Sequence, residues 1–166
     1  MLPISNQAKK LTVALRRKPQ AVAIMKGSAD YSAIAGQVFF CQTELGILVA
    51  ADITGLPKAG TRCQSPIFAF HIHSGASCTG SMEDPFSGAM THYNPGNCPH
   101  PYHAGDLPPL FGNNGYAFSV FLTDRFSIQE IIGKTAIIHK NPDDFTTQPS
   151  GNAGEKIACG VIQRYA

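Results

Sequence analysis

Six histidines are the residues of this 166-residue chain best suited to chemistry, and all of them lie between His71 and His139. Imidazole nitrogens bind zinc and copper, so histidines gathered in one part of a sequence suggest a metal site. His71 and His73 lie two residues apart in the segment FAFHIH. If that segment is a strand, both side chains project from the same face of it. The pair alone is weak evidence, because exposed polar residues on a sheet have the same spacing.

The stretch THYNPGNCPHPYHAGDL is a stronger signal, since it holds His92, His100, His103 and Asp106 within 15 residues. Three imidazoles and a carboxylate suit tetrahedral zinc, and Cys98 in the same stretch is an alternative ligand. The intervening prolines and glycines allow a loop to turn around an ion. A histidine-rich surface loop is the competing interpretation. His139 ends the apolar segment TAIIH, where a lone histidine is more often an edge residue than a ligand.

Seven short segments, alternating or apolar and bounded by turn residues, are expected to be the strands that position these side chains. They are residues 21–25, 35–41, 47–53, 67–73, 116–123, 135–139 and 156–162. Seven such segments predict an antiparallel sandwich or barrel. A helical turn is expected near residues 127–131. The two long turn-rich stretches, 74–114 and 140–155, are expected to carry function, because long irregular loops in a domain usually do.

Charge and composition exclude several classes of protein. The net charge is +2, but five positive residues and no acidic residue lie in the first 18 positions. The remaining 148 residues carry 8 basic and 11 acidic side chains, so the body is weakly acidic and a poor candidate for binding nucleic acid. With 14% charged and 43% hydrophobic residues, disorder is not expected.

The N-terminal residues 1–19 form a basic arm, and residues 20–166 are expected to form a single domain. Ala8, Leu11 and Leu15 have helical spacing, which predicts a short amphipathic helix in the arm. No apolar run reaches the roughly 18 residues that span a bilayer, so no membrane partner is expected. The first residues lack the pattern of a secretory signal. The expected location is therefore cytoplasmic for the chain as written, or periplasmic or secreted if a leader has been removed.

Five motifs in order, HIH, THYNP, H-x-x-H-A-G-D-L, IIGKTAIIHKNPDD and SGNAGEKIACGVI, resemble those of the copper/zinc superoxide dismutase family, in a bacterial-type member. The resemblance runs from about Gln20 to the C-terminus. It implies an all-β fold, a flattened antiparallel Greek-key β-barrel of the immunoglobulin-like sandwich type, with long metal-binding and channel loops. It also implies conversion of superoxide to dioxygen and hydrogen peroxide by a redox-active copper beside a structural zinc. The implied ligands are His71, His73, His92 and His139 for copper, and His92, His100, His103 and Asp106 for zinc.

The resemblance implies further roles outside the ligands. His92 would bridge the two ions and carry a catalytic proton, and Asp143 would link His71 to His100. Cys78 and Cys159 match the family's intrasubunit disulfide. Lys156 stands where the family carries an arginine that guides the anionic substrate, so anion docking is expected to be looser.

Other departures concern the loops and the remaining cysteines. His100 and His103 are closer together than in the family, which implies altered or weaker zinc binding. Cys41, Cys63 and Cys98 are not family positions. Cys41 fits a small apolar strand residue. Cys63 and Cys98 are either free thiols or a second bridge.

Two other functions compete with dismutation. The first is a copper- and zinc-binding protein of the same fold with little turnover, which the lysine at position 156 leaves open. The second is a zinc-only structural domain built on the THYNP to GDL stretch, although such a domain has no need of His139. Members of the family are commonly dimers, so the resemblance is compatible with a homodimer, and nothing in the sequence selects an interface.

Overall fold

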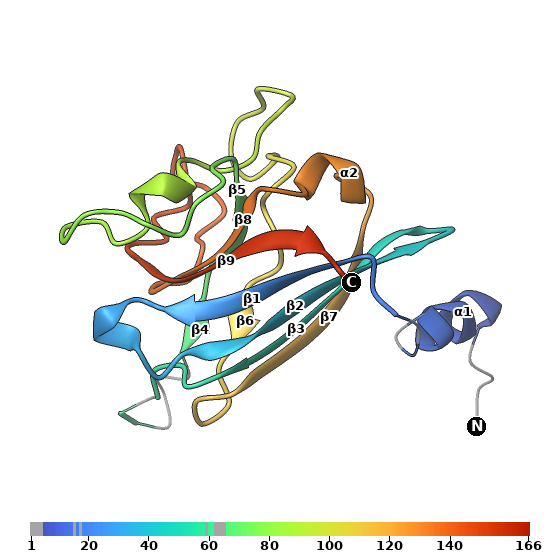
Figure 1. Cartoon of the computed structure of the whole chain (residues 1–166), viewed down its shortest axis with the longest axis horizontal. Helices are drawn as coiled ribbons and strands as arrows, with labels where there is room; N and C mark the ends of the chain where they lie inside the picture. The colour runs from blue at the N-terminus through green and yellow to red at the C-terminus, as the bar shows by residue number, and fades with distance from the viewer. Residues whose placement is uncertain (1–4, 15, 17, 59, 62–65) are drawn as a thin grey trace.

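A computed structural model describes residues 5–14, 16, 18–58, 60–61 and 66–166. It is mostly β structure, and a seven-stranded antiparallel sheet curls around the core (Figure 1). The order of strands in this sheet is β5-β8-β9-β1-β2-β3-β7. Their bounds are β1 Ala21–Gly27, β2 Ala35–Thr43, β3 Gly46–Thr54, β5 Phe70–His73, β7 Ala117–Thr123, β8 Thr135–His139 and β9 Lys156–Arg164. Six of the seven segments expected to be strands each form one strand, segment 67–73 forms two, and the arrangement agrees with the predicted Greek-key barrel.

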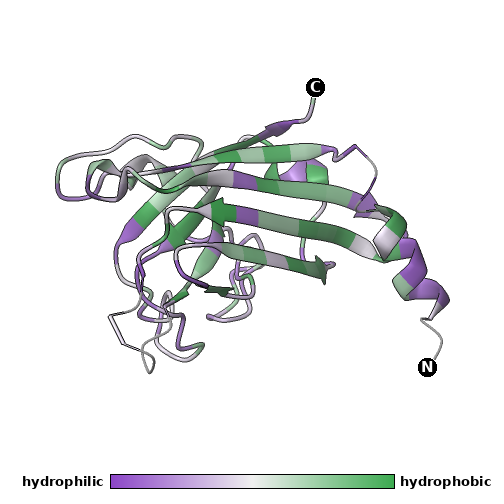
Figure 2. Cartoon of the chain, turned by 90° about the horizontal axis from the view of Figure 1, so that it is seen from below, coloured by the Kyte–Doolittle hydropathy of each residue, from purple (hydrophilic) through white to green (hydrophobic). Residues whose placement is uncertain are grey.

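Two features explain the topology: buried and exposed residues alternate along the strands, and the last strand returns to pair within the sheet. In β1, Ala21, Ala23 and Met25 are buried while the residues between them face outward, as expected for a strand with one face on the core. The last strand, β9, pairs with both β8 and β1, which brings the C-terminal segment between the two halves of the sheet. Figure 2 shows apolar residues concentrated along the strands.

The segment 67–73, expected to be one strand, is divided in two. Ala69 donates its N–H to the carbonyl of Asn141 at 2.8 Å and accepts from the N–H of His139 at 2.9 Å. The residues before it form β4, Ile67–Phe68, which pairs with β6, Leu110–Phe111, while β5 pairs with β8. β6 was not predicted, because a strand of two residues is too short to show an alternating pattern.

Helices are few and short in the described part of the chain. α1, Asn6–Ala14, lies beside the turn between β2 and β3, where Lys10 forms an ion pair with Glu44 (Figure 1). This agrees with the helix expected in the arm, although Leu15 lies outside the described residues. The expected turn near 127–131 is α2, Ile128–Ile131, which begins with a capping box between Ser127 and Glu130. Two 3-10 turns, η1 Ala29–Tyr31 and η2 Ser87–Ala89, complete the helical elements among the described residues.

The division into residues 1–19 and 20–166 stays a prediction. Among the described residues, no helix has the length and apolar character required to cross a membrane.

The two long loops gather over the β5–β8–β9 end of the sheet (Figure 1). The first loop is attached to β5 through isolated bridges, His73 with His92 and His71 with Asp106. The second leaves β8 and returns to β9, and its two ends are joined by hydrogen bonds such as that from Lys140 N–H to the carbonyl of Glu155 at 3.0 Å. The sheet edge and the two loops therefore meet where the histidines lie.

Candidate metal centre

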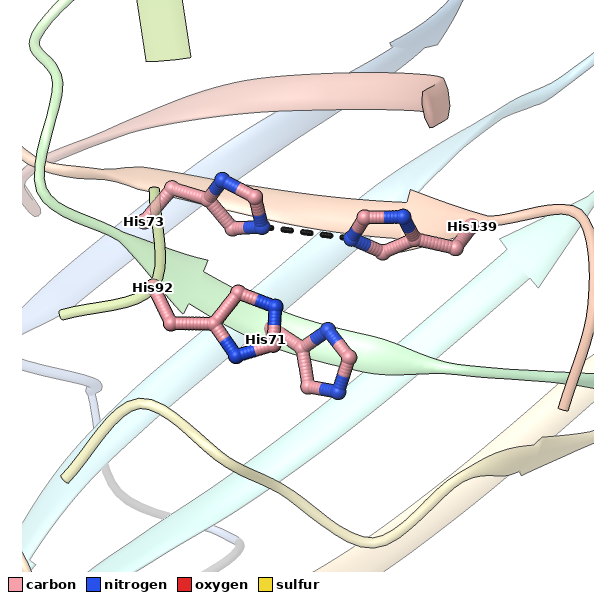
Figure 3. A group of neighbouring side chains, drawn as sticks. All are labelled: His71, His73, His92 and His139. Carbon is pink, nitrogen blue, oxygen red and sulfur yellow. Dashed lines mark hydrogen bonds between the residues drawn. The ribbon is translucent and has the colours of Figure 1, made fainter. Parts of the chain in front are cut away.

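Four buried histidines form the first of two clusters. His71 and His73 come from β5, and His139 ends the neighbouring strand β8. His92 comes from the first loop and reaches the strand through its bridge with His73. The ligand atoms offered by these four side chains all lie within 4.8 Å of one another, and the rings converge (Figure 3). The same-face expectation for His71 and His73 is confirmed.

The second cluster lies entirely on the first loop and shares His92 with the first. His92, His100, His103 and Asp106 are all buried, and their ligand atoms also lie within 4.8 Å of one another. His92 Nδ1 is 2.7 Å from Asp106 Oδ1 and 3.3 Å from His103 Nδ1. Because Nδ1 of His92 faces this cluster, its Nε2 is the nitrogen left for the first cluster.

The hydrogen bonds of His73 and His139 fix which of their nitrogens can bind a metal. His73 Nδ1 is 2.9 Å from the carbonyl of Met90, and His139 Nδ1 is 3.0 Å from the carbonyl of Gly154. A carbonyl only accepts, so both rings carry their proton on Nδ1. Their Nε2 atoms face each other at 3.2 Å (Figure 3). Burial, the largest cause, holds the pKa of His73 well below its ordinary value and lowers that of His139 to about 3, so both rings are neutral.

The lone pairs on Nε2 of His73 and of His139 face each other and repel, and a cation bound between them would remove that repulsion. Three other nitrogens also require a cation: His71 Nδ1, His92 Nε2 and His100 Nδ1 are buried and have no hydrogen-bond partner among the described residues. His100 Nδ1 lies 3.0 Å from an oxygen of Asp106, but without hydrogen-bond geometry. Buried polar atoms without partners are rare and need an explanation. Ions at the two clusters would satisfy them, so the residues present fit copper and zinc.

Asp143 joins the two clusters from behind. Its Oδ2 is 2.8 Å from His71 Nε2, and its Oδ1 is 2.8 Å from His100 Nε2. Burial raises the pKa of Asp143, but hydrogen bonds from His71, the backbone N–H of Phe145 and His100 outweigh this and lower it to about 2. The ionised carboxylate therefore orients both rings, and in each it leaves Nδ1 for a metal.

The electrostatics of the second cluster suit zinc. Burial raises the pKa of Asp106, but the hydrogen bond from His92 and the neighbouring imidazoles outweigh it, so the pKa lies below its ordinary value. Burial lowers the pKa of His103. Imidazoles together with one carboxylate are a donor set that zinc takes in tetrahedral sites.

A disulfide joins Cys78 to Cys159, with an S–S distance of 2.03 Å and a sequence separation of 81. It attaches the first loop to β9, as the resemblance implied. Cys41 is a free buried thiol, which agrees with a small apolar strand residue, and Cys98 is a free exposed thiol. Cys63 lies outside the described residues.

A pocket of about 390 Å³ opens onto the first cluster, lined by His73, His92 and His139, by Lys156 and by Pro149 and Ser150 of the second loop. The structure thus places Lys156 beside the first cluster. Its ammonium forms an ion pair with Asp84 of the first loop. Sequence reasoning did not single out Asp84. Its position six residues after Cys78 is a usable signal, because the bond to Cys159 brings that segment close to Lys156.

Comparisons with known proteins agree with this site. The family model described as copper/zinc superoxide dismutase matches residues 34–162. "Superoxide dismutase [Cu-Zn]" of Legionella pneumophila is 35% identical over 136 residues, which cover 77% of each chain. "Superoxide dismutase [Cu-Zn] 2" of Aquifex aeolicus (strain VF5) is 30% identical over 145 residues, covering 78% of this chain and 80% of the relative. "Superoxide dismutase [Cu-Zn] A" of Xenopus laevis is 32% identical over 160 residues, covering 86% of this chain and 96% of the relative.

The matched family, the similarity to bacterial relatives along most of the chain and the two adjoining ligand clusters lead to one assignment. The chain belongs to the copper/zinc superoxide dismutase family.

Proposed function

We propose that the chain dismutates superoxide in the 390 Å³ pocket in front of the first cluster, with copper held by His71, His73, His92 and His139. Zinc is held by His92, His100, His103 and Asp106. The overall reaction consumes two superoxide ions and two protons and yields one dioxygen and one hydrogen peroxide. Bound copper supplies a one-electron couple between Cu(II) and Cu(I), which both oxidises and reduces superoxide. The observation that carries the proposal is the pair of clusters that share His92.

His92 is proposed to handle the proton. Its Nδ1 faces Asp106 and His103, while its Nε2 has no hydrogen-bond partner in the described part of the chain and belongs to the cluster that borders the pocket. A ring fixed at one nitrogen keeps the other in a constant position. Nε2 can therefore take up a proton and give it to a peroxide product in the pocket, which is general acid catalysis by a positioned imidazole.

Lys156 is proposed to attract the substrate. It lines the pocket, where a positive charge raises the local concentration of a small anion. The ion pair with Asp84 reduces that charge and fixes the ammonium to one side. Because a lysine also lacks the planar fork of arginine, the anion is held less tightly than an arginine would hold it.

The disulfide supports an oxidising compartment, because disulfides persist in periplasmic and secreted proteins and are rare in the cytosol. We infer that the protein works in the periplasm or outside the cell. Alkylation of thiols on protein taken directly from its native cells tests this. Cys78 and Cys159 are expected to be protected while the exposed Cys98 is alkylated, and alkylation of all three thiols would contradict it.

The function is tested on four samples of one preparation: metal-free, zinc only, copper only, and loaded with both metals. Metal content is measured in each, and the decay of superoxide is followed optically. Rapid decay is expected only in the two samples that contain copper. A fully loaded protein with one copper per chain and no decay above the metal-free sample would leave a copper-binding protein without turnover.

A further inference from the structure

The loop that carries the second cluster, residues 92–106, has little regular structure of its own, yet it must present four ligand atoms to one ion. We refer to it as the ligand loop. Several of its backbone hydrogen bonds are local or reach β5: Tyr93 N–H donates to the carbonyl of Ile72, and Gly105 N–H donates to that of Tyr93, both at 2.8 Å. These contacts secure the two ends of the loop. The middle, from His100 to His103, is held by side chains from elsewhere in the fold.

Arg125, which follows β7, reaches the ligand loop from outside. One guanidinium nitrogen, Nη1, donates to three backbone carbonyls: Pro101 at 3.2 Å, His103 at 3.3 Å and Asp106 at 3.0 Å. Two of these carbonyls belong to residues of the second cluster. The arginine as a whole is exposed, but its hydrogen bonds to residues 103 and 106 are partly buried. Arg125 thus fixes the spacing of the last two ligands along the loop.

Gln148, on the second loop, holds the remaining part of the ligand loop. Its Oε1 accepts from the backbone N–H of His100 at 2.9 Å, and its Nε2 donates to the carbonyl of the same residue at 2.7 Å. Through these two hydrogen bonds, the side-chain amide of Gln148 holds the backbone of the ligand residue His100. A rotation of His100 about its own backbone would break both bonds.

We infer that Arg125 and Gln148 are positioning residues for zinc, which clamp the backbone of the ligand loop from two sides. The inference rests on the proposed zinc site. Neither residue provides a ligand atom, and both act on the backbone that aims the ligands. Side chains that orient metal ligands typically contribute tenfold to hundredfold in metal affinity. Both residues are exposed as a whole, so the effect is expected in zinc binding more than in folding.

The test compares Arg125→Gln, Arg125→Lys and Gln148→Glu with the wild-type protein, all copper-free and with the disulfide intact. Zinc affinity is measured by competition with a chromophoric chelator. Arg125→Gln is expected to weaken zinc binding about tenfold to a hundredfold. Arg125→Lys is expected to lie between this variant and the wild type, because an ammonium keeps the charge but loses the planar donors. Gln148→Glu loses the donor to the His100 carbonyl and is expected to weaken binding about tenfold.

Matched controls come from exposed positions at the end of β9. Arg164→Gln removes the same charge as Arg125→Gln, and Gln163→Glu makes the same change as Gln148→Glu. Both controls are expected to bind zinc like the wild type. Cobalt in place of zinc adds a spectroscopic readout, since the intensity of its visible bands depends on tetrahedral geometry. The bands are expected to weaken or shift in the Arg125 variants and not in the controls.

Thermal unfolding of metal-free and zinc-loaded samples separates positioning from general stability. A variant that weakens zinc binding lowers the stability of the loaded protein by more than that of the metal-free protein. Equal losses in both forms, with unchanged zinc affinity in Arg125→Gln and in Gln148→Glu, would overturn the inference. If wild-type protein and a His103→Ala variant bind zinc equally well, the proposed zinc site itself fails, which is a different outcome.

Discussion

The two clusters adjoin, yet the chain builds them in different ways. Three of the four ligands of the first cluster lie on β5 and β8, whose backbones are fixed by the hydrogen bonds of the sheet. All four ligands of the second cluster lie on the ligand loop, which is held by side chains from other segments. The first cluster should therefore respond mainly to changes in its own ligands. The second should respond also to changes far along the sequence.

The largest expected effect comes from removing one ligand of each cluster in turn. His139→Ala removes a strand-borne nitrogen, so copper binding is expected to be lost and superoxide decay to fall to the metal-free rate. His103→Ala leaves His71, His73 and His139 on their strands, so zinc is expected to be lost while copper stays bound. Metal content after dialysis, measured with superoxide decay, checks both. Equal loss of copper in the two variants would contradict the independence of the first cluster from the second.

The next effect concerns the disulfide, which attaches the first loop to β9. Replacing Cys78 and Cys159 together with serine is expected to lower the free energy of unfolding by about 2–5 kcal/mol, because the bond closes a long loop in the unfolded chain. Denaturant unfolding measures the change, with Cys98→Ser, at an exposed free thiol, as the control. If the comparison of clusters holds, the folded double variant still binds copper. Loss of copper from folded protein would show that the strands alone do not place the first cluster.

Acid sensitivity of the metal-free protein follows from its neutral histidines. The pKa of His139 is about 3 in the folded protein, against an ordinary value of 6.5, so the unfolded chain takes up the proton first. Stability is therefore full above pH 6.5 and falls as the pH drops toward 3, by up to roughly 1.4 kcal/mol per pH unit for each such group. Asp143, with a pKa of about 2 against 3.8, adds a loss in the same direction between pH 3.8 and 2.

Thermal unfolding of metal-free protein between pH 7 and pH 4 measures this slope. His139→Ala is expected to flatten it, because the group that must stay unprotonated is gone. A slope unchanged by that substitution would mean that other groups cause the acid sensitivity.

Much of this molecule could be predicted from its sequence, because strands and ligands leave local patterns. The alternation of apolar residues located the seven long strands, and the spacing of His71 and His73 placed both rings on one face. The family motifs led to Asp143 and the Cys78–Cys159 bond, both of which join distant segments. The sequence could not indicate Arg125 or Gln148, and for Asp84 its only signal is the short distance along the chain from Cys78. Each acts through a contact across the fold, and an exposed arginine, glutamine or aspartate has the same local pattern whether or not it makes such a contact.

Gly151 offers a way to disturb the second cluster without replacing any of its ligand residues. It has a φ of +67°, and a Cβ placed there would come within 1.9 Å of Asp143 Oδ1 and 2.7 Å of His100 Nε2. Gly151→Ala is therefore expected to displace the carboxylate and weaken zinc binding about tenfold or more. Gly133→Ala is a matched control, because Gly133 has a φ of +82° and no atom of the other described residues lies within 4 Å of the added atom. Both variants place an alanine at a positive φ, which costs about 1 kcal/mol of backbone strain. Only Gly151→Ala should lose zinc affinity in a chelator competition.

The smallest expected effect concerns the pocket in front of the first cluster, where Lys156 forms an ion pair with Asp84. Asp84→Asn removes the negative charge and leaves the ammonium free to attract an anion. A unit charge roughly 10 Å from an anion in water is worth about 0.4 kcal/mol, a factor of about two in rate. The dismutation rate is therefore expected to rise about twofold at low salt, and the gain should disappear at high salt because the charges are screened.

Glu83→Gln distinguishes the effect of this ion pair on the rate from that of the negative charge of the loop as a whole. Glu83 is an exposed acid next to Asp84, and its carboxylate accepts a hydrogen bond from Ser81 at 3.0 Å. Its substitution removes the same charge and leaves the contact between Asp84 and Lys156 in place, so it should raise the rate by less than Asp84→Asn. Equal gains would mean that the whole loop repels the substrate. A lower rate in Asp84→Asn would mean that the carboxylate is needed to aim Lys156, so that attraction of the substrate to the first cluster depends on this contact with the first loop.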